Sequence, residues 1–354
     1  MPWKNSWFQL ALVTAIFSAG LLIFDFGRGV SFKLPHSTAS GTPTTPPTPT
    51  EPTPNPPAPE PTPAPTPAPE PVAPVAGGPT LDKPWQNSLG MVFMPVPGTK
   101  VLFSQYDARV QDFAAFVNDT GYDATADMDS SSMDYGWGQN KGFNWKSPGF
   151  SQTDDCPVVG VNWADANKFC AWLTSKDQAA GKIASNQSYR LPTQAEWSIA
   201  VGSGKYPWGD QWPPPDGAGN YADQSFAQSV SPPIKSVVPG NDGYPRTSPV
   251  GKFHPNQYGL YDMGGNVWQW CDDYYDTSMN SADLTNKYPR MAAPSQMYRV
   301  IRGASWWADN PQDMLEADNW ADAPVALQSA YTDLCMPTVR KDNMGFRPVL
   351  VVAP

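Results

Sequence analysis

The chain has 354 residues with 42 prolines, and its formal net charge is −10. Seventeen of the prolines lie between Pro43 and Pro79, so the first 79 residues do not form an ordinary globular domain. The rest, about 275 residues, holds 13 of the 15 tryptophans and is large enough for a sizeable core. Its acidic balance argues against nucleic acid and anionic lipid as partners. Its single histidine, His254, excludes zinc sites that need two or three imidazoles.

The N-terminus carries an uncharged apolar run at residues 8–24. At 1.5 Å per residue this run spans roughly 26 Å, which is just enough to cross a bilayer. No small-x-small cleavage site closes it. Residues 1–28 are therefore predicted to be an uncleaved membrane anchor with a cytoplasmic N-terminus, and a cleaved signal peptide is the alternative.

Residues 29–79 form a predicted Pro/Thr/Ala-rich linker. Its composition favours polyproline II, which at ~3.1 Å per residue could hold a domain up to roughly 100 Å from the membrane. We therefore expect residues 80–354 to form an extracytoplasmic domain, periplasmic or at the cell surface. Only Lys4 precedes the apolar run, whereas Arg28 and Lys33 follow it. The positive-inside rule alone therefore favours the reverse orientation, and the expectation depends on the linker.

Apolar periodicity predicts the elements of the first half of the domain. Asn162 is placed to cap a helix that carries Phe169 and Leu173 on one face. In chain order, we expect a strand at residues 91–96, a helix at 108–118, a long ordered loop without metal at 123–155, a short strand at 158–161 and a helix at 163–175.

The second half has fewer regular elements. Thr193 and Glu196 stand in capping-box spacing and predict a third helix, followed by loop to about residue 248. Strand candidates follow at residues 259–270, 299–306 and 345–352. A domain this rich in loops and tryptophan, with few helices, is predicted to be an irregular α+β unit.

Seven motifs in the domain follow one another in an order that resembles the formylglycine-generating, or sulfatase-modifying-factor, family. The resemblance covers roughly residues 85–352 and implies an irregular, loop-rich C-type lectin-like fold whose N- and C-terminal strands lie near each other. The motifs are Asn-Ser-Leu-Gly-Met at 87–91, Pro-Val-Val-Gly-Val-Asn-Trp at 157–163, Arg-Leu-Pro-Thr-Gln-Ala-Glu-Trp at 190–197, Tyr-Pro-Trp-Gly at 206–209, Asn-Gln-Tyr-Gly-Leu-Tyr-Asp-Met-Gly-Gly-Asn-Val-Trp-Gln-Trp at 256–270, Arg-Gly-Ala-Ser-Trp at 302–306 and Asn-Met-Gly-Phe-Arg at 343–347.

The family's oxidases use copper and O₂ to convert a substrate cysteine to formylglycine. They hold copper with two cysteines, five residues apart, shortly before the Gly-Phe-Arg motif, and soft thiolates suit copper(I). Counted back without gaps, the matching positions here are Asn319 and Pro324. The only cysteine after Cys271 is Cys335, so the resemblance implies that the copper pair is missing. The chain also has Cys156 and Cys170, and the sequence leaves one or two disulfides open.

The resemblance also implies structural calcium, which prefers oxygen ligands. The first site would use the side chains of Asn220 and Asp242 and the carbonyls of Tyr221 and Tyr244. The second would use Asp262, the carbonyls of Gly265 and Val267, and Gln269, which stands where the family has a glutamate. From the residues alone, Asp242 in Asn-Asp-Gly could instead form only a turn.

The tryptophans divide into two groups. Trp163, Trp197 and Trp268 lie in shared motifs and are expected in the core. Trp306, Trp307, Asn319 and Trp320 lie in the segment where the family's oxidases build their substrate groove, beside several Asp and Asn residues. We expect exposed aromatic groups there to form a ligand-binding surface, and packing within the core is the alternative.

Two functions follow. The first is a ligand-binding module on a membrane-tethered stalk, with a peptide, glycan or protein as ligand; some relatives of this fold are variable ligand-binding proteins, whose variable segment is the C-terminal one. The second is an enzyme, either the formylglycine-generating oxidase or an iron-dependent relative, whose histidines this chain lacks. The missing cysteine pair favours the binding module.

Overall fold

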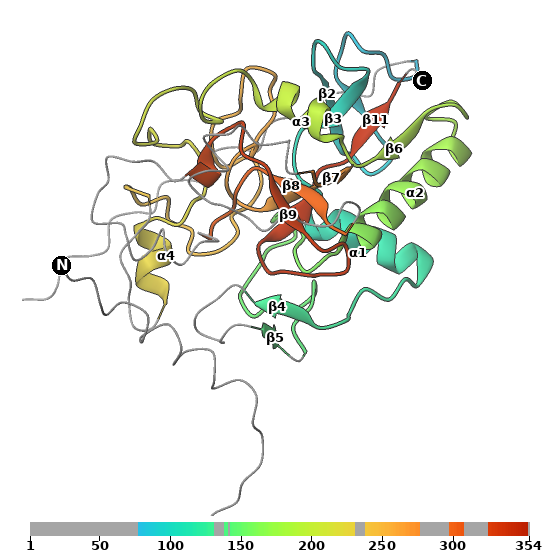
Figure 1. Cartoon of the computed structure of the whole chain (residues 1–354). Coiled ribbons are helices and arrows are strands. Elements are labelled where there is room, and N and C mark those ends of the chain that lie inside the picture. Colours follow the sequence, from blue (N-terminus) through green and yellow to red (C-terminus); the bar gives the residue numbers. More distant parts are fainter. Residues whose placement is uncertain are drawn as a thin grey trace, which may run out of the picture. The chain divides into compact units, whose positions relative to one another are not determined.

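The computed structural model describes residues 77–130, 138–140, 142–230, 238–276, 297–307 and 325–352. These residues belong to one compact unit, Pro67–Pro354. They form a five-stranded, a four-stranded and a two-stranded sheet, joined by long connections (Figure 1). The predicted irregular α+β character is therefore confirmed. No helix in the described part is long and apolar enough to span a bilayer, and the predicted anchor and most of the linker lie outside it.

The five-stranded sheet joins the two ends of the domain. Its interior strand β11 is the last of the chain and pairs antiparallel with β3 on one side and with the edge strand β6 on the other. Leu350 lies opposite Leu102 and Tyr189, and all three side chains are buried, which fixes the register. The strands in sheet order are β1 (Trp85–Gln86), β2 (Val92–Pro95), β3 (Val101–Ser104), β11 (Val349–Val351) and β6 (Ser188–Arg190).

The four-stranded sheet lies in the middle of the domain and separates two hydrophobic clusters. Trp270 belongs to the larger cluster and its neighbour Cys271 to the smaller one, as expected for side chains that alternate between the faces of a strand. Both faces are therefore covered. The strands in sheet order are β10 (Met344–Phe346), β7 (Trp268–Tyr274), β8 (Arg299–Arg302) and β9 (Asp333–Cys335), with β10 parallel to β7 and the other pairs antiparallel.

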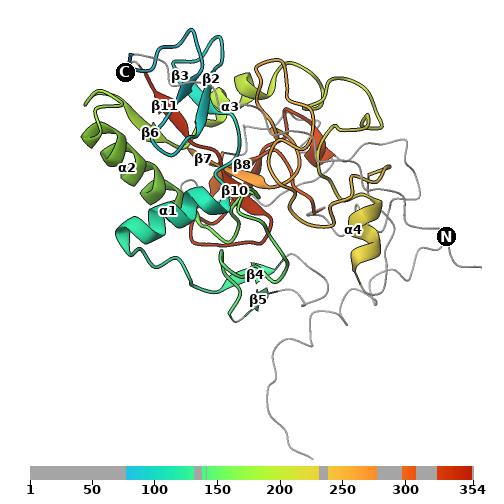
Figure 2. The ribbon, with the colours of Figure 1, turned by 180° about the vertical axis from the view of Figure 1, so that it is seen from behind.

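Helices α1 (Val110–Thr120) and α2 (Trp163–Ala179) lie side by side (Figures 1 and 2). They are joined by an aromatic cluster in which Phe113 and Phe116 of α1 contact Phe169 of α2. The helix expected at 108–118 thus begins two residues later and ends at Gly121, whose φ of 67° suits a residue without a side chain. The predicted Asn162 cap is confirmed, although α2 extends four residues beyond the expected end.

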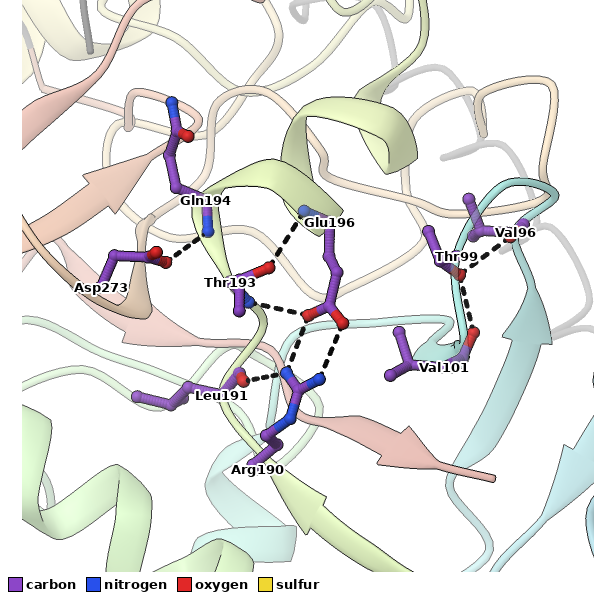
Figure 3. A network of polar contacts seen from close by, with 9 residues as sticks. All are labelled: Val96, Thr99, Val101, Arg190, Leu191, Thr193, Gln194, Glu196 and Asp273. Atoms are coloured by element: carbon purple, nitrogen blue, oxygen red, sulfur yellow. Dashed lines mark hydrogen bonds and ion pairs between the residues drawn. The ribbon is translucent and has the colours of Figure 1, made fainter. Parts of the chain in front are cut away.

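Helix α3 (Gln194–Val201) begins at the predicted capping box (Figure 3). Thr193 Oγ1 accepts a hydrogen bond from the Glu196 backbone N–H, and Glu196 Oε2 accepts one from the Thr193 N–H. Arg190 adds two bonds to the same carboxylate, both 2.7 Å long. The Gln194 N–H donates to Asp273 of β7, so the start of α3 is fixed to the four-stranded sheet.

The remaining elements differ from the expectations for a physical reason. The predicted strand at 158–161 is wrong, because its backbone bonds go to separate segments: Val158 N–H to Ala108 and Gly160 N–H to Lys341. The single strand expected at 345–352 is two strands, β10 and β11, since the chain crosses between sheets at Arg347 and Pro348. Three elements were missed within predicted loops: β4 (Met128–Ser130), β5 (Gly138–Asn140) and helix α4 (Gln224–Ser229). The 3-10 turn η2 (Val325–Leu327) lies where no element was predicted.

Candidate functional site

The four cysteines lie in different parts of the core, and none forms a disulfide. Cys271 is on β7 and Cys335 on β9, with β8 between them. At the usual spacing of strands their backbones are roughly 9–10 Å apart. Cys271 packs in the smaller hydrophobic cluster and Cys335 in the larger one, so their thiols leave opposite faces of the sheet. Two thiolates on one metal lie within about 4.6 Å of each other, which this arrangement does not allow.

The buried thiols are also poor ligands for another reason. Burial raises the pKa values of Cys170 and Cys271 far above the ordinary range of a thiol. The thiolate is the form that binds metal or acts as a nucleophile. These two cysteines are therefore held as neutral, apolar core groups. The positions matched to the copper pair by counting, Asn319 and Pro324, lie outside the described residues.

The four residues of the first predicted calcium site come together between α4 and two loops. Asp242 Oδ2 accepts a hydrogen bond of 3.0 Å from the Tyr221 N–H, and Asp242 Oδ1 accepts one of 2.7 Å from the Tyr244 N–H. Asn220 is fully buried and donates through Nδ2 to the Arg246 carbonyl at 2.7 Å. Its other side-chain atom, Oδ1, is buried without a hydrogen-bond partner. A buried amide oxygen that accepts no hydrogen bond calls for another partner, and a cation can be that partner.

The electrostatics of this site also fit a cation. Burial and the neighbouring Asp223 carboxylate raise the pKa of Asp242 to about 6. Asp223 caps α4 and accepts a hydrogen bond from the Asp242 N–H, which places both carboxylates on one side of the site. The site opens into a pocket of about 120 Å³ that Asp216 also lines. Calcium would supply the positive charge that relieves this arrangement, so the carboxylates and the Asn220 amide oxygen fit it, while the Tyr221 carbonyl also accepts a hydrogen bond from the Asp223 N–H at 2.7 Å.

Sequence analysis missed Asp223, although its sequence context contains a signal. It stands two residues before Ser225, whose backbone N–H and hydroxyl both donate to its carboxylate, as in an Asx turn at a helix start. That pattern predicts that Asp223 caps a helix. Its position beside Asp242 depends on the tertiary fold and is not visible in the sequence.

The second predicted site is built differently. Gln269 Oε1 already accepts hydrogen bonds from Trp197 Nε1 at 2.9 Å and from Arg347 Nε at 3.2 Å. Gln269 Nε2 donates to the Asp262 carbonyl at 2.8 Å, so both ends of the amide are occupied. The amide oxygen is therefore not available to a cation, and the set implied by the resemblance does not fit calcium.

The other predicted members of that site are Asp262, Gly265 and Val267. They lie close by and have structural contacts of their own. Asp262 Oδ2 accepts from the Gly251 N–H at 3.1 Å, while Oδ1 has no hydrogen-bond partner. Gly265 has a φ of 80°, and a Cβ there would lie 2.4 Å from the Asn220 carbonyl oxygen, so only glycine fits. Val267 is fully buried. The two predicted sites thus share a wall at Gly265.

A buried arginine takes the central place in the second region. Arg347 is fully buried and donates to the carbonyls of Ser104 and Tyr261 as well as to Gln269. Its guanidinium lies 3.4 Å from Asp107, whose carboxyl is also fully buried. Burial raises the pKa of Asp107 to about 8, and the charge of Arg347 opposes that shift. Sequence analysis noted Arg347 only as part of a motif and missed Asp107.

The predicted aromatic surface lies partly in the core. Trp306 and Trp307 are 0% and 2% exposed and pack with Phe226 of α4, with ring centroids 5.8 and 4.8 Å apart. The exposure expected of these two indoles is wrong, because α4, which the sequence did not predict, covers them. Asn319 and Trp320 lie outside the described residues. Of the tryptophans expected in the core, Trp197 and Trp268 are buried and Trp163 is partly buried.

A family model for the sulfatase-modifying factor enzyme 1-like domain matches residues 96–352. The chain belongs to this family. Within the family it is 33% identical over 235 residues to the formylglycine-generating enzyme of Thermomonospora curvata, which covers 58% of this chain and 70% of that protein. It is also 33% identical over 215 residues to the inactive C-alpha-formylglycine-generating enzyme 2 of Bos taurus, which covers 57% of this chain and 54% of the relative. The chain thus spans about half of that bovine protein.

Two solved structures align with this chain over most of its length. PvdO from Pseudomonas aeruginosa aligns over 71% of this chain and 80% of its own, with 23% identity and a TM-score of 0.46. Variable protein 1 of Treponema denticola aligns over 71% and 84%, with 24% identity and a TM-score of 0.42.

Proposed function

We propose that this domain is a ligand-binding member of the sulfatase-modifying-factor family and does not oxidise cysteine. The observation that supports this most directly is the placement of Cys271 and Cys335 on opposite faces of the four-stranded sheet. No other cysteine follows Cys271 in the sequence, so a copper(I) site with two thiolates has no source of ligands in the family's position.

The test is incubation of the purified full chain with copper(I), O₂ and a cysteine peptide of the sulfatase type, followed by mass spectrometry of the peptide. We expect the cysteine to remain unmodified and copper to bind weakly. Formylglycine in the peptide would favour the alternative, a sulfatase-modifying oxidase. In that case Cys271→Ser and Cys335→Ser would show which thiol serves.

We further propose that the segment 306–322 carries the ligand-binding surface, with a peptide, glycan or protein as ligand. Trp306 and Trp307 fix the start of this segment to α4, and Trp320 is the aromatic residue left to contact a ligand. Trp320→Ala is expected to weaken binding without lowering the melting temperature, whereas Trp307→Ala should destabilise the fold by about 3–5 kcal/mol as a core truncation. Equal loss of stability in both variants would count against the surface.

Calcium is proposed as a structural ion at Asn220, Tyr221, Asp242 and Tyr244. Bound there, it would neutralise Asp242 and Asp223 and fix the loop 238–248 beside α4. The test is calcium analysis of the purified chain before and after exposure to a chelator, with Asp242→Asn as the variant that should not retain the ion.

The proposed location is outside the cytoplasmic membrane, tethered by residues 1–28 and spaced by residues 29–79. Its support is the uncharged run and the proline tract of the sequence. Protease added to spheroplasts should release a domain of about 275 residues, as the composition of residues 80–354 predicts. Complete protection of the domain would contradict this location.

A further inference from the structure

A second hollow lies beside the C-terminal end of α3, apart from the predicted ligand segment. It has a volume of about 340 Å³, and its walls come from residues 201–204 and 206–209, from Pro215 and Ala218, and from residues 254–257. Among the described residues it shares no lining residue with 306–307. Ligand pockets in proteins begin at roughly 300 Å³, so a molecule with one or two small rings fits this volume.

The walls of this hollow are held by hydrogen bonds within the protein. Asn256 Nδ2 donates to the Ala200 carbonyl at 2.7 Å, and Asn256 Oδ1 accepts from the N–H groups of Tyr258 and Leu260. Tyr206 and Gly209 exchange two backbone hydrogen bonds of 2.8 and 2.9 Å. The pocket is therefore preformed, and a ligand need not order these loops on binding.

The floor is aromatic. The Trp208 ring is partly buried and stacks on Tyr206 with an interplanar angle of 5° and a centroid distance of 4.9 Å. Trp208 Nε1 is bonded to the Gln211 carbonyl at 2.8 Å, so the indole is held in one orientation. A fixed indole offers apolar area to a ligand at little cost in conformational entropy.

The rim is polar but carries no carboxylate or ammonium group among the described lining residues. Ser203, His254 and Gln257 are exposed and supply hydroxyl, imidazole and amide groups. Two charged residues that adjoin lining residues in the sequence have partners of their own. Lys205 Nζ lies over the Tyr206 ring at 5.2 Å, and Asp210 accepts a hydrogen bond from the Lys205 N–H. The pocket is thus suited to an uncharged ligand with an apolar face and several hydroxyl groups.

We propose that this pocket binds a neutral sugar ring, with its C–H face against Trp208 and its hydroxyl groups toward Ser203, His254 and Gln257. This site goes beyond the proposed surface at 306–322 and does not depend on it. A sugar meets both requirements at once, because one face of the ring is apolar while its edge is lined with donors and acceptors. A charged ligand would lack a counter-charge in the rim, and an aliphatic one would leave the rim groups without partners.

The chain offers a direct probe of the pocket, since His36 and His254 are its only histidines. The full chain, labelled with ¹³C at the histidine ring and kept in detergent, should give two ring signals, assigned with His36→Gln. We would titrate it with the methyl glycosides of glucose, galactose, mannose and N-acetylglucosamine. At least one glycoside should shift the His254 signal at millimolar concentration and leave the His36 signal unchanged.

Variants separate a sugar site from a general effect. Gln257→Ala changes an exposed side chain and should weaken the shift-derived affinity about tenfold, and Trp208→Ala should abolish it. Trp172→Ala is the matched control, because this partly buried tryptophan of α2 does not line the pocket. No shift of His254 with any of the glycosides would overturn the proposal, as would equal affinity in Gln257→Ala. A shift caused only by a proline-rich peptide, added as a separate arm, would assign the pocket to peptide and also overturn it.

Discussion

The two regions that the family resemblance marks for calcium are neighbours in this domain, yet their amide side chains are held differently. At the first, the buried Asn220 Oδ1 has no hydrogen-bond donor, and the Asp223 carboxylate contributes to the raised pKa of Asp242. At the second, the Gln269 amide is bonded at both ends and Arg347 supplies a fixed positive charge. At the second region, an amide stands where the resemblance implies a carboxylate, and this amide belongs to an internal hydrogen-bonded core.

The largest effect is expected from breaking the second region. Arg347→Ala would leave the buried Asp107 without its counter-charge and would remove a donor from the carbonyls of Ser104 and Tyr261 and from Gln269 Oε1. Removal of one partner of a buried pair costs about 3–5 kcal/mol of unfolding free energy. Urea denaturation of the variant and the parent chain measures this difference. Lys176→Ala is the control, since its pair with Asp119 is exposed and is screened by solvent, so it should contribute little to stability. Similar small losses in both variants would mean that Arg347 does not hold the second region together.

The first region should respond to calcium. An ion that binds only the folded state adds about 2.7 kcal/mol at a hundredfold excess over its Kd. A chelator should therefore lower the melting temperature of the parent chain, and Asp242→Ala should remove the difference between the two curves. If a chelator leaves the melting curve of the parent chain unchanged, Asn220 and Asp242 do not bind calcium.

A carboxylate at position 269 tests whether the second region can be made to bind calcium. Gln269→Glu keeps the acceptor for Trp197 and Arg347 but replaces the donor that bonds the Asp262 carbonyl with a second acceptor. We expect a loss of about 1–3 kcal/mol without calcium, the cost of a buried group without its partner. Added calcium should restore part of this loss, as measured by thermal unfolding at several calcium concentrations. Restoration by magnesium but not by calcium would contradict a site of the calcium type.

The smallest effect concerns the start of α3. Glu196→Gln removes the charge that pairs with Arg190 but keeps an oxygen for the capping box. The pKa of Glu196 is lowered in the fold, because the hydrogen bonds and charge of Arg190 and the Thr193 N–H outweigh its burial. A lowered pKa contributes stability that is present above the unfolded pKa near 4.5 and is lost as the pH falls through the folded value. The variant should lose about 1 kcal/mol at neutral pH and nothing at acid pH, as measured by denaturation at both.

Much of the fold could be predicted from the sequence, because its signals are local. Asn162 and the Thr193–Glu196 pair mark helix starts by residue type and spacing alone, and both were confirmed. Helix α4 was missed, since a six-residue helix lacks the periodicity that identifies a longer one. Because helix α4 was not predicted, Trp306 and Trp307 were expected to be exposed, whereas α4 covers them.

The candidate sites were less predictable because they depend on contacts between distant residues. The resemblance placed Asn220 and Asp242 together, but Asp223 joined them only through the start of α4. The Gln269 side-chain oxygen accepts hydrogen bonds from Trp197 and Arg347, which are 72 and 78 residues away in the sequence. No local pattern reports whether such an amide faces a cation or a donor.

Metal analysis of the full chain tests the central claim most directly, namely that this domain keeps oxygen ligands for calcium but no thiolate pair for copper. The chain would be equilibrated with calcium and copper(I) together, freed of excess ions, and measured by mass spectrometry of its metal content. The account predicts one calcium ion per chain and no stoichiometric copper. Stoichiometric copper, or the absence of calcium, would contradict it.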